Sequence, residues 1–202
     1  GNTPGSDMKL TTQRLEAGRN FANKLWNAAR FVLSNIPVMD EKEYNMYLND
    51  STQTPTEDRW IASRLNRLVA NVNRLLEDFQ FGEAQREIYE FLWGEYCDWY
   101  IEFAKIRLRD SNAISPVPIL IHVLETALRL LHPVMPFVTE ELWQALTDIV
   151  RFLKSVDSIM IAPYPQEAGE TDIEAEHEIE AVIEIIRAIR NIRTERKVED
   201  SV

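Results

Sequence analysis

The side chains best suited to chemistry in this sequence are amides, cations and an aromatic ring, gathered between residues 18 and 33. At helical spacing, six of them share the face opposite the apolar positions: Asn20, Asn23, Lys24, Asn27, Arg30 and Phe31. Amides can read the edges of bases, guanidinium groups contact phosphates or stack, and an exposed phenyl ring offers a platform for an unpaired base. This combination predicts a surface for single-stranded RNA.

The same stretch must also have an apolar face that holds those groups in place. Its members recur every three or four residues and are expected to be buried: Leu15, Ala22, Leu25, Trp26, Ala29, Val32 and Leu33. Two polar-face residues have a plainer alternative. Phe31 could pack against Ile36 instead of a base, and Arg30 could pair with an acidic side chain.

Further basic residues form two groups elsewhere in the chain. Arg64, Arg67 and Arg74 lie at i, i+3 and i+10, within one stripe of a predicted helix, where they could hold phosphates of an RNA stem or be merely solvated. Near the C-terminal end, arginines recur at every third position: Arg187, Arg190, Arg193 and Arg196. The sequence leaves open whether this second group faces RNA or another part of a polypeptide.

The net charge of −11 argues against non-specific binding to nucleic acid, DNA included. Eight of the acidic residues, however, fall between positions 167 and 184, where there is no Lys or Arg. Setting those eight aside leaves 25 acidic residues against 22 basic ones. Because attraction to phosphate depends on local potential, a specific contact through a basic patch remains compatible with this composition.

Composition and periodicity predict an all-α helical bundle. The 202 residues are 45% hydrophobic, contain only 6 Gly and show almost no strand-like alternation. Helices are expected at about 12–35, 43–48, 54–79, 82–108, 117–131, 137–146 with an extension toward 152, and 173–196. Thr54 followed by Pro55 and Glu57 is typical of a helix start, with Thr54 as the N-cap.

Signals of catalysis are absent from the sequence. It has no glycine-rich phosphate loop, no nucleophile elbow, and no Cys or His pair at metal-ligand spacing. The single cysteine, Cys97, excludes an internal disulfide and suits a reducing cytoplasm. No apolar run approaches the roughly 20 residues of a membrane span, so no membrane partner is expected. The chain alone does not resemble an enzyme.

Several motifs, in order along the chain, resemble the anticodon-binding domain of bacterial valyl-tRNA synthetases. Asn-Lys-Leu-Trp-Asn-Ala-Ala-Arg-Phe at 23–31 and Cys-Asp-Trp-Tyr at 97–100 are the most specific for valine. Pro-Phe-x-x-Glu-Glu-Leu-Trp at 136–143 indicates only the valine, isoleucine and leucine subclass. The resemblance also covers Asp-Arg-Trp-Ile at 58–61, Ser-Ile-Met-Ile-Ala-Pro-Tyr-Pro at 158–165 and Ile-Arg-Asn-Ile-Arg-Thr-Glu at 189–195.

The resemblance implies a bundle of the class I synthetase anticodon-binding type with an extra C-terminal helix. Residues 1–10 would be a linker from a catalytic domain of the same polypeptide, and 11–155 the bundle. Residues 156–202 would form a proline-rich connector, an acidic loop and a helix. The implied partner is the anticodon stem-loop of valine tRNA, whose last two anticodon bases are A and C in this family.

The resemblance also narrows the residues expected at the RNA. Asn27, Arg30 and Phe31 would contact the anticodon, with Asn20 and Lys24 one to two turns earlier. Arg64 and Arg67 are the candidates for phosphates of the stem.

No cofactor is expected in this chain. The ATP-binding signatures of the parent enzymes, His-x-Gly-His and Lys-Met-Ser-Lys-Ser, do not occur in it, so ATP and magnesium would belong to the catalytic part. One alternative is the corresponding domain of an isoleucyl- or leucyl-tRNA synthetase. Another is a helical protein-interaction module with Trp60, Trp93 and Tyr100 as interface anchors.

Overall fold

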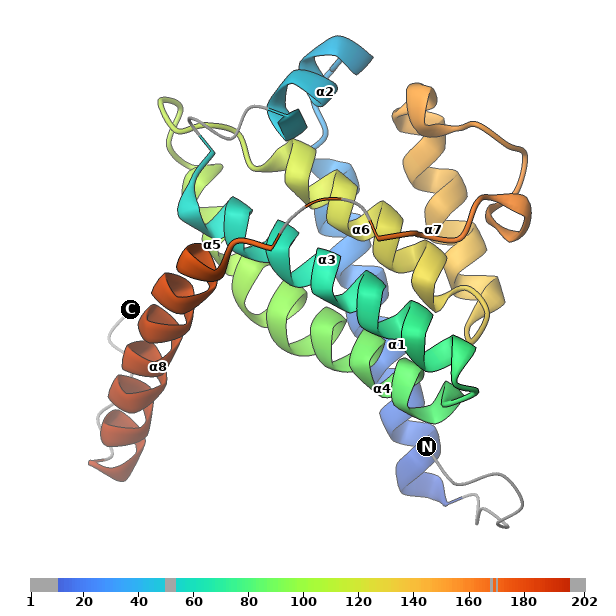
Figure 1. The fold of residues 1–202 in the computed structure, drawn as a ribbon. Coiled ribbons are helices and arrows are strands. Elements are labelled where there is room, and N and C mark those ends of the chain that lie inside the picture. The colour runs from blue at the N-terminus through green and yellow to red at the C-terminus, as the bar shows by residue number, and fades with distance from the viewer. Residues whose placement is uncertain (1–10, 50–53, 168, 170, 197–202) are drawn as a thin grey trace.

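The computed structural model describes residues 11–49, 54–167, 169 and 171–196, and throughout these ranges the chain forms helices and connecting loops (Figure 1). The expected linker at 1–10 lies outside the described residues. In chain order the helices are α1 (Thr12–Ser34), α2 (Glu41–Asn49), α3 (Thr56–Glu77), α4 (Phe81–Glu90), η1 (Phe91–Tyr100), α5 (Ile101–Arg107), α6 (Val117–Leu131), α7 (Pro136–Ile149), η2 (Arg151–Leu153), η3 (Ile159–Ile161) and α8 (Ile173–Glu195). The all-α prediction is confirmed.

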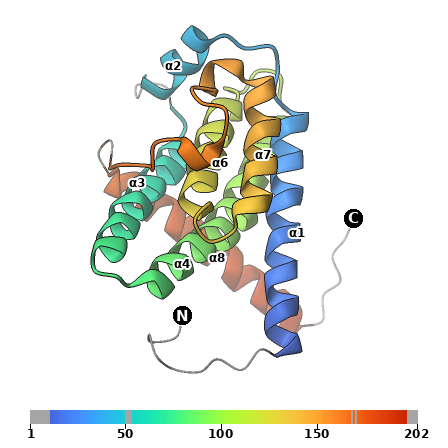
Figure 2. The same cartoon turned by 90° about the vertical axis from the view of Figure 1, so that its right-hand side faces the viewer.

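The long helices pack side by side around one core (Figures 1 and 2). Helix α6 lies at the centre and contacts α1, α3, α4 and α7. Twelve of its side chains are buried, as expected for a helix that is apolar on most faces. The largest fully buried side chains come from its neighbours: Trp60 on α3, Tyr96 and Tyr100 on η1, and Trp143 on α7.

The helix expected at 82–108 is one continuous rod, but its middle third has π geometry. Residues of η1 follow α4 directly and continue directly into α5. In a π-helix the hydrogen bonds run from i to i+5, so residues five apart lie above one another. Phe91, Tyr96 and Ile101 have this spacing, and all three are buried. Apolar spacing in the sequence did not reveal this wider turn.

The buried face of α1 is rotated relative to the predicted one. Phe21, Leu25, Ala28, Ala29 and Val32 form the buried stripe. The prediction was wrong for two large side chains: Leu15 is 57% exposed and Trp26 is 40% exposed. Both lie on the flank of the helix. The Phe21 ring instead packs inward, with 4.8 Å between its centroid and that of the Tyr89 ring, and this contact helps to set the rotation of α1.

The start of α3 also differs from the prediction. Pro55, and not Thr54, occupies the N-cap position, and no side chain caps the helix there. The carbonyl of Pro55 instead accepts hydrogen bonds from the amides of Asp58 and Arg59 at 3.0 and 3.1 Å.

Helix α8 packs along α3 through a buried polar joint. The Asp172 carboxylate caps α8 by accepting from the Ala175 amide at 2.9 Å, and it pairs with Arg59 of α3 at 2.8 Å. Glu176 is buried and accepts from Ser63 and Arg67. The C-terminal end of α8 extends away from the other helices in Figure 1. Within the described residues no helix has the length and apolarity that crossing a membrane requires.

Candidate nucleic-acid interface

The outward face of α1 carries the residues that the sequence singled out for RNA. Asn20, Asn27 and Arg30 are exposed, while Lys24 and Phe31 are half-buried. Helical spacing places all five on the side of α1 away from Leu25 and Val32, which are buried. The structure therefore places these five candidate contacts on one face of α1.

The rod formed by α4, η1 and α5 runs alongside α1 in the same direction. Three ring contacts or cation contacts mark this path: Phe21 with Tyr89, Lys24 with Trp93, and Phe31 with Lys105. The candidate surface therefore has two sides, one formed by residues of α1 and the other by residues of the rod. The side on the rod, with Tyr89, Trp93 and Lys105, was not predicted as part of an RNA site.

Lys24 is held between an acid and an aromatic ring of the rod. Its Nζ forms an ion pair with Asp98 and lies 3.9 Å from the centre of the Trp93 ring. The Trp93 ring in turn stacks on Tyr89, with 5.7 Å between ring centroids. Because its charge is already partnered, Lys24 reaches phosphate only by exchanging Asp98 for it.

Arg30 has a different environment. Among the described residues, no carboxylate pairs with its guanidinium and no hydrogen bond engages it. The alternative that Arg30 pairs with an acid is therefore not realised in the described part of the chain. An exposed guanidinium with all its donors open can bind a phosphate or the edge of a base without first breaking a contact.

Phe31 is half-buried and packs against the core of the bundle. Its ring packs against the core, and the Nζ of Lys105 lies 5.6 Å from the ring centre. Lys105 is itself paired with Glu102 at 2.6 Å. The ring is therefore half-buried, and a base that stacks on it has to share it with Lys105.

Arg64 and Arg67 lie in a different part of the molecule, between α3, η1 and α8. Arg64 makes a two-pronged ion pair with Glu95, at 2.7 and 2.8 Å, and the hydrogen bonds with Glu95 raise its pKa above the ordinary value. Arg67 donates to Glu176 at 2.8 Å. These contacts join helices, and they were invisible in sequence because the partners are 31 and 109 residues away.

The C-terminal arginines also contact the protein. The guanidinium groups of Arg187 and Arg190 lie 5.6 and 5.3 Å from the centre of the Trp99 ring. Trp99 belongs to η1, so these two contacts hold α8 against the rod. The two arginines thus face the bundle.

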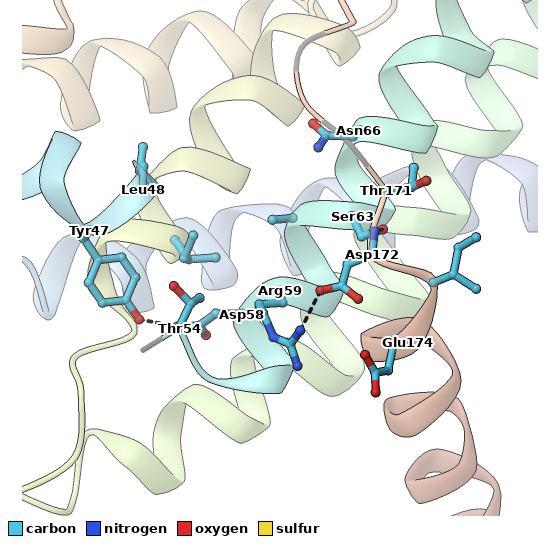
Figure 3. A pocket seen from close by; sticks show the side chains of 13 residues that line it. Tyr47, Leu48, Thr54, Asp58, Arg59, Ser63, Asn66, Thr171, Asp172 and Glu174 are labelled. Carbon is cyan, nitrogen blue, oxygen red and sulfur yellow. Dashed lines mark hydrogen bonds and ion pairs between the residues drawn. The ribbon is translucent and has the colours of Figure 1, made fainter. Parts of the chain in front are cut away.

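A pocket of about 640 Å³ lies between α2, the first half of α3 and the start of α8 (Figure 3). Three of its charged groups are already paired: Arg59 with Asp172, and Asp58 with Tyr47. Asp58 also accepts from Tyr100 at 2.7 Å and from Arg107 at 2.5 Å. These contacts join α2, α3, η1 and α5, so the paired groups stabilise the fold. In the described ranges, His, Cys, Asp and Glu side chains form no cluster suited to a metal ion.

Comparison with known proteins assigns the chain to a family. Residues 58–202 match the family model described as the anticodon-binding domain of tRNA ligase. That match covers more than half of the chain, and the chain therefore belongs to this family. Helix α1 precedes the matched residues.

Three curated relatives whose alignments include α1 are valine–tRNA ligases. The enzyme of Dehalococcoides mccartyi strain CBDB1 is 52% identical over 203 aligned residues, which include 100% of this chain. The enzymes of Latilactobacillus sakei and Geobacillus stearothermophilus are 44% and 42% identical, each over 96% of the chain. In all three cases the chain spans 22% of the relative's length.

Proposed function

We propose that the chain is the part of a valine–tRNA ligase that recognises the anticodon stem-loop of valine tRNA. The observation that carries this proposal is the outward face of α1, where Arg30 has no partner among the described residues and lies next to Phe31. Membership of the anticodon-binding family and the valine–tRNA ligase relatives support the choice of partner.

In this proposal the residues on α1 have different tasks. Arg30 and Asn27 bind the splayed anticodon bases and the phosphates between them, and Phe31 stacks on one base. Asn20 and Lys24, one to two turns earlier on α1, contact the neighbouring part of the RNA strand. The ion pairs of Arg64 and Arg67 with Glu95 and Glu176 favour a structural role for those two arginines, so we leave them out of the surface.

In this proposal the chain binds tRNA, and another part of the polypeptide catalyses the ligation of valine to it. Activation of the amino acid, with ATP and magnesium, we assign to a catalytic domain outside these residues. The protein-interaction alternative is weakened, because Trp60 and Tyr100, two of its three anchors, are buried at 2% and 0% exposure. They cannot reach a partner's surface.

Competition between stem-loops tests the proposal. The 202-residue chain is mixed with labelled valine stem-loop, and unlabelled valine, isoleucine and leucine stem-loops are added in turn. The valine competitor should displace the label at a concentration at least tenfold below the other two. Equal displacement by all three would contradict recognition of valine tRNA, and preference for isoleucine or leucine would favour the related synthetases.

A further inference from the structure

An aliphatic stripe runs along the outer side of α8. Its members are exposed by 42 to 59%, and they are Val182, Ile185, Ile189 and Ile192. Their spacing of three, four and three residues places them on one side of a helix. Four neighbouring β-branched side chains in water are an unusual outer surface for a helix whose other side is already packed.

The direction of this stripe is fixed by contacts on the other side of α8. Ile179 and Ile183 are buried where α8 packs along α3. Arg187 and Arg190 hold the next turns against Trp99 of η1. Helix α8 therefore cannot roll to bury the outer stripe without giving up these contacts.

The surroundings of the stripe suit a packed partner. Ala181 and Ala188, both exposed, flank it and leave room for close approach of another backbone. In the same line along the helix, Glu178 precedes the stripe and Arg196 follows it. The stripe thus has an apolar centre with an acid at one end and a base at the other.

We propose that this stripe, formed by Val182, Ile185, Ile189 and Ile192, is the surface on which an apolar face from another part of the same ligase polypeptide docks. The relatives extend far beyond the matching region, which makes up only 22% of their length. The inference rests on the assignment of the chain to a longer ligase, and it is independent of which RNA α1 binds.

The size of the stripe favours a partner in the same polypeptide over a second copy of the chain. Four half-exposed aliphatic side chains offer on the order of 250 Å² of apolar area, by the usual area per methylene. A stable dimer buries about 800 Å² on each partner. A tethered segment avoids most of the entropy cost of association, so a small apolar surface is sufficient for it.

Thiol labelling in two contexts tests this docking surface. Ile189→Cys is placed in the 202-residue chain and in the full-length ligase, and its reaction with a maleimide is followed by peptide-resolved mass spectrometry. Asn191→Cys, exposed on the other side of the same turn, is the matched control. The native thiol of Cys97 serves as a slow reference, because burial raises its pKa to about 12.

The proposal predicts that labelling at 189 falls at least tenfold in the full-length ligase, whereas labelling at 191 changes less than twofold. Unchanged labelling at 189 would overturn it. Protection in the short chain that grows with concentration would point to a second copy and would also overturn it.

A second measurement covers the case in which the cysteine variant perturbs the ligase. The double variant Ile185→Lys with Ile189→Lys should leave the melting temperature of the 202-residue chain unchanged and lower that of the full-length ligase. No difference between the two contexts would contradict docking.

Discussion

At the scale of single residues, Lys24 and Arg30 are both cations on the outward face of α1, yet only one is ready to bind RNA. Lys24 is occupied by Asp98 and by the Trp93 ring, whereas no described residue pairs with Arg30. Exposed ion pairs are weak, so Asp98 does not block RNA but competes with it. The two positions should therefore respond differently to substitution.

Arg30→Ala should weaken binding of the valine stem-loop without changing the melting temperature, since the side chain is exposed. Loss of one phosphate contact lowers the slope of log K against log salt by about 0.7 for single-stranded RNA. Titrations at four salt concentrations measure this slope. Arg86→Ala, an exposed arginine on α4, is the control and should leave affinity unchanged. A folded Arg30→Ala protein with full affinity would remove Arg30 from the surface.

Phe31→Ala should cost about 1–3 kcal/mol of binding free energy if a base stacks on the ring. Phe31→Tyr keeps a ring and should retain most of the affinity, which separates stacking from general damage to the helix. Direct titration with the stem-loop, together with a melting curve for each variant, gives both quantities. Equal affinity of the Ala and Tyr variants would argue against a stacked base.

Asp98→Asn should strengthen RNA binding, because it releases Lys24 for phosphate. The gain should be independent of the bases and should steepen the salt dependence. Binding to the valine stem-loop and to a sequence-scrambled hairpin would be compared. The control Glu83→Gln removes the partner of Arg86 on α4 and should have no effect. A weaker complex would show that Asp98 positions Lys24 instead of competing for it.

At the scale of elements, helical periodicity predicted most helix positions but not the contacts between helices. The exposed positions of Asn20, Asn27 and Arg30 followed from spacing alone, and they are confirmed. The partner of Lys24 could not be predicted, because Asp98 lies 74 residues away. The exposed side of Trp26 was also missed, since an apolar type does not reveal which flank a neighbouring helix covers.

The joint between α3 and α8 belongs to this scale. Glu176 is 6% exposed and accepts from Ser63 and Arg67. Glu176→Gln removes the charge that pairs with Arg67 and Arg64, and it should lower the free energy of unfolding by about 1–3 kcal/mol. Urea denaturation measures the loss, and amide exchange in α8 should rise first. Glu178→Gln, exposed two residues later, is the control and should change neither.

At the scale of the whole molecule, the buried phenols and the thiol predict sensitivity to alkaline pH. Burial raises the pKa of Tyr164 and of Cys97 to about 12. Burial likewise raises the pKa of Tyr44, Tyr96 and Tyr100 above the ordinary value. The folded chain therefore keeps protons that the unfolded chain releases near pH 9 to 10.

Because the folded state binds more protons in that range, stability should be constant up to about pH 9 and fall as the pH rises toward 12. Each pKa unit of difference corresponds to about 1.4 kcal/mol. Urea midpoints between pH 7 and 11 measure the decline, and tyrosinate absorbance should rise together with unfolding. Full ionisation of the tyrosines in a chain that stays folded would contradict the burial of these groups.

The central claim is that the α1 surface reads the bases of the valine anticodon. The measurement that tests it most directly is binding of the chain to a labelled valine stem-loop at low and moderate salt, beside a variant with both A and C replaced. We predict binding that weakens with salt and drops at least tenfold in the variant. Equal affinity for both stem-loops at each salt concentration would contradict base readout and leave only contact with phosphates.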